Sequence, residues 1–155
     1  MIIFTIIFLA FDIFSKLIIS KYISINENVP IIKNFLNITN VRNTGVAWSL
    51  FDNQTLLVLI ISTIVIIGII IYIKKNKPNT NIEKISYSMI LGGALGNLIE
   101  RLVYSYVTDF IDIHIFGYNY PIFNLADTFI VIGAILLIII SWRNEYGKNK
   151  SKRRK

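Results

Sequence analysis

Four long apolar stretches dominate the pattern of hydrophobic and polar positions along this chain of 155 residues. A helix that crosses a bilayer needs about 20 predominantly apolar residues, and each stretch comes close to that length. The stretches run from Ile2 to Ile19, from Leu56 to Ile73, from Ile85 to Val103 and from Ala126 to Trp142. The pattern predicts an all-α membrane protein with four transmembrane helices, formed by residues 1–155 as a single domain.

The segment between the first two stretches follows a different pattern. Pro30 to Val41 is rich in isoleucine, asparagine and threonine, which favours short strands. Asn43-Thr44-Gly45 follows and supplies residues that tolerate a positive φ, so we expect a turn there. This loop is too small to fold alone. We therefore expect a small β-containing region that rests on the membrane surface against the helices.

Composition supports a membrane environment, because 54% of the residues are hydrophobic, more than a soluble domain of this length requires. The first stretch does not have the pattern of a cleaved signal peptide. No basic residue precedes it, it contains Asp12 and Lys16, and it lacks a convincing small-x-small cleavage site. We expect this stretch to be retained as a helix.

The net charge of +7 is distributed unevenly. Basic residues follow the second and fourth stretches: Lys74, Lys75, Lys77, Lys84, Arg143, Lys148, Lys150, Lys152, Arg153, Arg154 and Lys155. The positive-inside rule then places both termini and the basic tail 143–155 in the cytoplasm. The loops from Ser20 to Thr55 and from Tyr104 to Phe123 are expected outside. Attraction of the tail to anionic membrane lipids is favoured over nucleic-acid binding.

The residue types present restrict the possible chemistry. The chain has no cysteine, so a disulfide, a thiolate metal site and a cysteine nucleophile are all excluded. His114 is the single histidine, which makes a serine triad or a multi-histidine metal site hard to build. We interpret His114 as a hydrogen-bonding residue of its loop and expect neither a metal nor an organic cofactor.

Polar side chains within a span cost on the order of 2.5–3.5 kcal/mol each at the helix centre, so each requires an explanation. Asp12 and Lys16 are spaced i, i+4 on one helical face, where they can form an ion pair. Gly92 and Gly96 form a small-x-x-x-small face that lets another helix approach closely. Packing explains the two glycines, whereas for Asp12 and Lys16 a purely structural ion pair and a functional role both remain open.

Asn97 and Arg101 are also spaced i, i+4, so an amide and a guanidinium share one face near the outer end of the third stretch. Arginine offers several fixed donors for carboxylates, peptide carbonyls or lipid headgroups. The alternative is that Arg101 only extends to the interface to keep its charge in water.

Acidic residues near the outer surface are the strongest candidates for chemistry. Asp109 and Asp112 stand between hydrophobic residues of the second outer loop, and Asn124 and Asp127 open the last stretch. Asn124 and Asp127 alone resemble a helix capping box. Two carboxylates that face each other in a partly desolvated site would share a proton, as in aspartic proteases. The ionised one would activate a water to attack a peptide carbonyl, and the protonated one would donate a hydrogen bond to the carbonyl oxygen. The residues alone do not decide between Asp109 and Asp112.

Five motifs in order along the chain resemble those of the bacterial lipoprotein signal peptidases, signal peptidase II. They are Asp12-Ile13-Phe14-Ser15-Lys16, Arg42-Asn43-Thr44-Gly45-Val46-Ala47-Trp48-Ser49, Gly92-Gly93-Ala94-Leu95-Gly96-Asn97-Leu98-Ile99-Glu100-Arg101, Val107-Thr108-Asp109-Phe110 and Phe123-Asn124-Leu125-Ala126-Asp127. Each motif alone is weak, but together they cover nearly the whole chain except the tail.

The resemblance implies four spans, cytoplasmic termini and an aspartic endopeptidase with Asp109 and Asp127 as its catalytic pair, in preference to Asp112. The residues that it implies as lining or supporting the site are Asn43, Gly45, Asn97, Arg101, Asn124, Asp12 and Lys16. The implied substrate is a prolipoprotein whose cysteine carries diacylglycerol, cut just before that cysteine. The implied location is the bacterial cell membrane, with the site toward the extracytoplasmic face, and we expect a monomer.

The chain departs from the family pattern at four positions. Glu100 replaces the usual aspartate, Trp48 replaces phenylalanine, Val46 replaces alanine and Thr108 replaces valine. These changes affect loop packing and substrate fit more than activity.

Two other classes of function remain open. A small transporter also carries carboxylates within a membrane, but transporters more often have internal repeats and more spans. In a non-enzymatic assembly factor, Asn124 and Asp127 would only cap a helix and the glycines would only pack.

Overall fold

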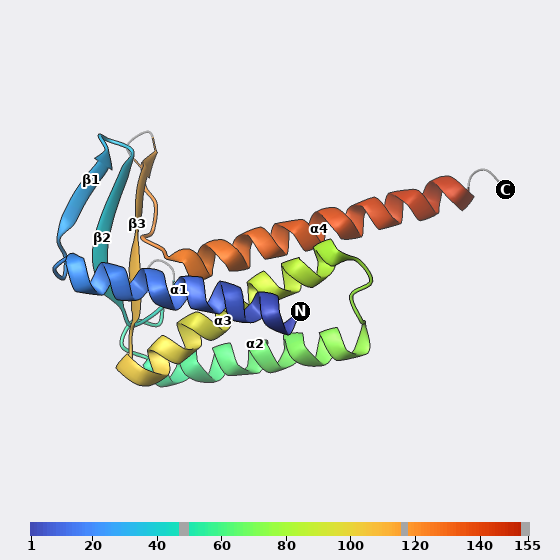
Figure 1. Cartoon of the computed structure of the whole chain (residues 1–155), viewed down its shortest axis with the longest axis horizontal. Helices are drawn as coiled ribbons and strands as arrows, with labels where there is room; N and C mark the ends of the chain where they lie inside the picture. The colour runs from blue at the N-terminus through green and yellow to red at the C-terminus, as the bar shows by residue number, and fades with distance from the viewer. Residues whose placement is uncertain (47–49, 116–117, 153–155) are drawn as a thin grey trace.

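The computed structural model describes residues 1–46, 50–115 and 118–152, and it contains four helices and four strands within them (Figure 1). The helices are α1 (Ile2–Tyr22), α2 (Thr55–Lys75), α3 (Asn81–Tyr104) and α4 (Leu125–Lys152). The strands are β1 (Asn28–Ile32), β2 (Leu36–Asn43), β3 (Val107–Ile115) and β4 (Tyr118–Asn119). The strands lie together at one end of the helices, and the N-terminus lies at the other end (Figure 1).

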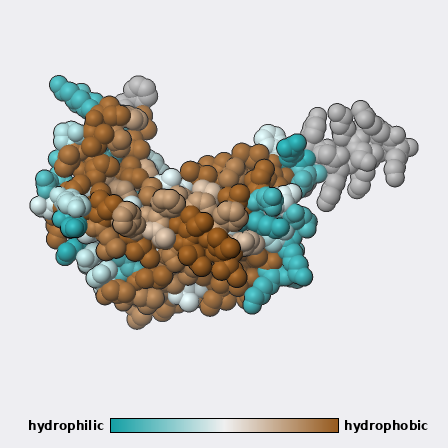
Figure 2. Space-filling view, viewed as in Figure 1, coloured by the Kyte–Doolittle hydropathy of each residue, from teal (hydrophilic) through white to brown (hydrophobic). Residues whose placement is uncertain are grey.

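Three helices in the described part of the chain are long and apolar enough to cross a membrane: α1, α2 and residues 125–144 of α4. Their side chains remain largely exposed, so they would face lipid. Figure 2 shows a broad hydrophobic belt over the helices, with hydrophilic residues gathered toward its two ends. The molecule is therefore mostly helical and has the surface of a membrane protein.

Helix α3 contains the stretch from Ile85 to Val103 but is not among these three apolar helices, because polar residues interrupt it. It packs against α1, α2 and α4 and is the most enclosed of the four helices. A Cβ added at Gly92 would lie 2.7 Å from the Phe8 Cβ on α1, and one at Gly96 would overlap Asp12. The prediction that these glycines allow close helix packing is confirmed.

The four strands form one antiparallel sheet in the order β1-β2-β3-β4. The β1-β2 hairpin confirms the strands predicted between Pro30 and Val41. Its turn, however, lies at residues 33–35, where Asn34 has a φ of 62°. The chain also bends at residues 44–46, just after Asn43 ends β2, so the change of direction expected at Asn43-Thr44-Gly45 is present, although neither Asn43 nor Thr44 has a positive φ.

The second outer loop is more ordered than the sequence indicates. Strand β3 occupies its centre and pairs with β2, although no strand is predicted there. Helix α4 continues past Trp142 to Lys152, so most of the tail 143–155 extends the helix. Ala47, Trp48 and Ser49 of the second motif, and residues 153–155 of the tail, lie outside the described residues.

Candidate active site

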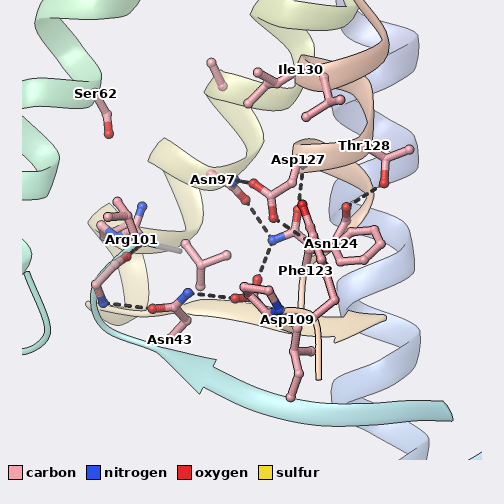
Figure 3. A pocket seen from close by; sticks show the side chains of 18 of the residues that line it. Asn43, Ser62, Asn97, Arg101, Asp109, Phe123, Asn124, Asp127, Thr128 and Ile130 are labelled. Atoms are coloured by element: carbon pink, nitrogen blue, oxygen red, sulfur yellow. Dashed lines mark hydrogen bonds between the residues drawn. The ribbon is translucent and has the colours of Figure 1, made fainter. Parts of the chain in front are cut away.

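A cavity of about 680 Å³ lies between the sheet and helices α2, α3 and α4 (Figure 3). One side of it is polar and is lined by Asn43, Gly45, Asn97, Arg101, Asp109, Asn124 and Asp127. The other side is apolar and includes Ile61, Val65, Ala94, Ile130, Val131 and Ile132. The cavity thus brings together every residue predicted for the site except Asp12 and Lys16.

Asp127 lies in the first turn of α4, where hydrogen bonds fix its carboxylate. The Asn124 backbone N–H donates to Asp127 Oδ2, and the Asp127 backbone N–H donates to Asn124 Oδ1, both at 3.1 Å. The predicted capping box is therefore present. It coexists with a contact across the bundle, because Asn97 Nδ2 on α3 donates to Asp127 Oδ1 at 2.8 Å (Figure 3).

Asp109 reaches the same cavity from β3. Asn124 Nδ2 donates to its Oδ1 at 2.6 Å, and Asn43 Nδ2 donates to its Oδ2 at 2.7 Å (Figure 3). The Gly45 backbone N–H donates to Asn43 Oδ1 at 2.9 Å, which orients that amide with its NH₂ toward Asp109. Asn124 contacts both aspartates, so it holds the two carboxylates in one hydrogen-bonded network.

Burial determines the protonation of Asp109, which is 4% exposed. Loss of solvent raises the pKa of this carboxyl to about 7, and the nearby charge of Asp127 acts in the same direction. The amide donors of Asn43 and Asn124 oppose both effects because they favour the ionised form. Asp109 therefore gains and loses a proton near neutral pH, as an acid–base group requires.

Lys16 and Asp12 lie behind the cavity on α1 and connect to it through other residues. Lys16 Nζ donates to Asp12 Oδ2 at 2.8 Å and to Asn97 Oδ1 at 2.7 Å, and it lies 3.1 Å from Glu100. Asp12 Oδ1 accepts a hydrogen bond from the Ala126 backbone N–H at 3.0 Å. The predicted ion pair is confirmed, and it also fixes the Asn97 amide and the start of α4.

Arg101 lies at the polar side of the cavity and is 6% exposed. Its Nη2 donates to the Gly45 carbonyl oxygen at 2.7 Å, which ties α3 to the segment after β2. Its Nε has no hydrogen-bond partner in the described structure. The alternative in which Arg101 only extends to the interface is wrong, since the side chain is buried.

Glu100 is a supporting residue that the sequence interpretation did not identify. It accepts hydrogen bonds from the Thr108 hydroxyl at 2.6 Å and from the Thr108 backbone N–H at 3.1 Å. These bonds attach β3 to α3 just before Asp109. Its acidic side chain next to Arg101, in an otherwise apolar stretch, was the available signal. The cavity residues on α2 had no such signal, because their sequence is that of an ordinary apolar transmembrane helix.

Asp112 and His114 lie on β3 but are not among the residues that line the cavity. Asp112 Oδ2 accepts a hydrogen bond from Asn37 Nδ2 at 3.1 Å and lies 2.9 Å from His114 Nε2. His114 is thus a hydrogen-bonding residue, as predicted, although it belongs to a strand. Of the two candidate acids in this segment, Asp109 is the one that lines the cavity.

Comparisons with known proteins agree with this geometry. The family model described as signal peptidase (SPase) II matches residues 4–143. A lipoprotein signal peptidase of Anoxybacillus flavithermus is 40% identical over 134 residues, which are 86% of this chain and 80% of that protein. A bacterial membrane enzyme solved by the in meso method superimposes with a TM-score of 0.86 at 36% identity, covering 95% of this chain and 90% of the other.

A second bacterial membrane enzyme solved by the same method gives a TM-score of 0.80 at 37% identity, with 90% of each chain covered. The family match therefore extends over both the helices and the sheet, including every residue of the polar side of the cavity. The chain belongs to the signal peptidase II family and is a peptidase of the aspartic type.

Proposed function

We propose that this enzyme removes the signal peptide from prolipoproteins by cutting just before a cysteine that carries diacylglycerol, with Asp109 and Asp127 as its catalytic pair. The observation that carries the proposal is that both carboxylates line one cavity and share the Asn124 side chain and backbone as hydrogen-bond donors. The name of the Anoxybacillus flavithermus relative supports a lipoprotein as the substrate.

The mechanism follows from a proton shared between the two aspartates. Like charges in a desolvated site do not both ionise readily, so one carboxyl holds the proton near neutral pH. The ionised member removes a proton from a water, which attacks the scissile peptide carbonyl. The protonated member donates to the carbonyl oxygen as the tetrahedral intermediate forms. The carboxyl that took the proton from water gives it to the nitrogen of the leaving amine as the C–N bond breaks, and the other carboxylate recovers its proton as the carbonyl re-forms.

Arg101 and the surrounding amides would orient the peptide part of the substrate. Arg101 lines the cavity and its Nε has no hydrogen-bond partner in the described part of the chain, and a guanidinium binds a peptide carbonyl through fixed N–H groups. Asn43, Asn97 and Asn124 already have their amides oriented by other hydrogen bonds. A site whose polar groups are held in place before the substrate arrives loses little free energy to reorganisation.

The lipid part of the substrate would enter sideways from the membrane. Ile61 and Val65 on α2 and Val131 on α4 line the cavity, yet their exposed fractions are 42%, 50% and 55%. The cavity is therefore open to the surroundings between α2 and α4, where lipid would lie. A substrate anchored in the bilayer could reach the aspartates by lateral diffusion, with its acyl chains in the apolar side of the cavity.

For the topology we propose that α3 is a fourth span, shielded from lipid by the three apolar helices that pack around it. Both termini would then lie in the cytoplasm, in agreement with the basic residues after α2 and in the tail. The sheet and the aspartates would lie at the extracytoplasmic face. We propose a monomer, because one chain supplies every residue of the catalytic network.

The test is to express Asp109→Asn and Asp127→Asn separately and to follow conversion of a diacylglyceryl prolipoprotein on a gel. Both variants should insert into the membrane and neither should cleave, since each loses the carboxylate that carries a proton. Asp112→Asn is the matched control on the same strand and should cleave normally. Wild-type cleavage by either of the first two variants would remove that aspartate from the mechanism.

A further inference from the structure

Ser62 places a hydroxyl group in a part of the cavity that is otherwise apolar. It lies on α2 between Ile61 and Val65, across the cavity from Asp127 (Figure 3). Serine and threonine in membrane helices commonly donate to a carbonyl of the preceding turn. Thr63 does this, with its hydroxyl 2.8 Å from the Leu59 carbonyl oxygen. Within the residues that the structure describes, the Ser62 hydroxyl has no hydrogen-bond partner.

The position of Ser62 along α2 is close to that of Asp127, on the side away from Asp109 (Figure 3). The Thr55 hydroxyl at the start of α2 donates to the Ser105 carbonyl at the end of α3, at 3.2 Å, so these two helix ends lie together. Ser62 is about two turns along α2 from that contact, and Asn97 is about two turns along α3 from it. Asn97 binds Asp127, and Figure 3 shows Ser62 on the opposite wall of the cavity, offset from Asp127 toward Ile130.

A hydroxyl in apolar surroundings is stabilised by a hydrogen-bond acceptor. The polar side of the cavity, with its amides and Arg101, matches a peptide. The α2 side, with its isoleucine and valine, matches acyl chains. In a diacylglyceryl peptide, the ester carbonyls lie at the boundary between the peptide and the acyl chains. They are only a few bonds from the cysteine sulfur and are therefore close to the scissile bond.

We propose that Ser62 is a substrate-binding residue that donates a hydrogen bond to an ester carbonyl of the diacylglyceryl group. The inference rests on the proposed function and deepens it, because it assigns recognition of the lipid linkage to a side chain of α2. This hydrogen bond can form with a lipidated cysteine and not with an unmodified one, because only the lipidated cysteine carries the ester carbonyls. An ordinary membrane phospholipid carries the same ester carbonyls, so the experiment must separate the two sources.

The experiment combines two enzyme variants with two synthetic substrates. Ser62→Val removes the hydroxyl, and Ser62→Thr has nearly the same shape as valine but retains it. One lipopeptide carries diacylglycerol in ester linkage, and the other carries the matching dialkylglycerol in ether linkage, which has no carbonyl. Thr63→Val, on the neighbouring residue outside the cavity, is the control. The measurement is kcat/KM in vesicles of constant lipid composition.

We expect Ser62→Val to lower kcat/KM for the ester substrate about three- to tenfold relative to Ser62→Thr, which is the effect expected from the loss of one hydrogen bond. For the ether substrate the two variants should be equal, and Thr63→Val should match the wild type on both. An equal loss on both substrates would overturn the inference, since the partner would then be a bulk lipid or the protein. Equal activity of both Ser62 variants on the ester substrate would also overturn it. Failure of the wild type to cleave either substrate would instead overturn the proposed function.

Discussion

Replacement of Asp109 by asparagine should make the stability of the protein less sensitive to a rise in pH while it abolishes cleavage. In the folded protein, burial raises the pKa of Asp109 from 3.8 to about 7. Below pH 3.8 the carboxyl is protonated in both the folded and the unfolded state, and the folded state has its full stability. As the pH rises toward 7, the unfolded chain ionises first, so stability is lost progressively. Asparagine does not ionise and avoids this loss.

The magnitude follows from the pH interval. Each pH unit between the two pKa values costs about 1.36 kcal/mol. From pH 5 to pH 7 the wild type therefore loses about 3 kcal/mol that the variant retains. For a protein of this size that is roughly 5–10 °C in Tm. The variant also carries a fixed cost, because two oriented amides donate to the Asp109 oxygens and one of them would meet an NH₂ group. That cost is the same at both pH values.

The assay is thermal unfolding in detergent micelles at pH 5 and pH 8, followed by circular dichroism. The quantity of interest is the change in Tm between the two pH values, in which the fixed hydrogen-bond cost cancels. The wild type should lose roughly 5–10 °C more than Asp109→Asn on going from pH 5 to pH 8. Parallel behaviour of the two proteins would refute the reasoning, because Asp109 would then not be a buried carboxyl with a raised pKa.

Two further substitutions test the helix packing and a helix terminus. Gly96→Ala would place a methyl group against Asp12 and force α1 away from α3. It should lower stability by about 1–3 kcal/mol and reduce cleavage, and an unchanged Tm would contradict the close contact. Thr80→Ala removes the capping box that Thr80 forms with Glu83 at the start of α3. It should cost about 1 kcal/mol in thermal unfolding and leave cleavage intact, whereas loss of cleavage would show coupling to the site.

The apolar helices were predictable because lipid imposes a simple requirement, a continuous run of apolar residues. This criterion identifies α1, α2 and α4 directly. Helix α3 meets it less fully: its stretch is long enough, but buried serines, glycines and Arg101 make it less apolar than the other three. An enclosed helix need not be apolar, so hydropathy alone does not determine whether it spans the membrane.

Strand β3 was not predicted because its residues do not alternate. Val107, Thr108, Asp109 and Phe110 are all buried, two of them polar, and the strand contacts α1 and α3 while Phe123 pairs along its edge. A strand buried on both faces lacks the period of two that identifies a half-buried strand. The β1-β2 hairpin is more exposed and was predicted from its composition.

Local parts of the site were predictable, and contacts across the fold were not. The i, i+4 pair of Asp12 and Lys16 and the capping box of Asn124 and Asp127 follow from helical spacing. The contact between Lys16 and Asn97, 81 positions apart, follows from no spacing rule. Only resemblance to a family favoured Asp109 over Asp112, and the cavity position agrees with that preference.

The ion pair on α1 also bears on how the enzyme is assembled. During synthesis α1 reaches the membrane before α3 and α4 have been made, so Asp12 and Lys16 have only each other to reduce the cost of insertion. Their later partners, Asn97, Glu100 and the Ala126 backbone N–H, come from helices synthesised afterwards. The first helix thus enters the bilayer with its charges paired, and the cavity that holds the two aspartates is complete only when the last helix arrives.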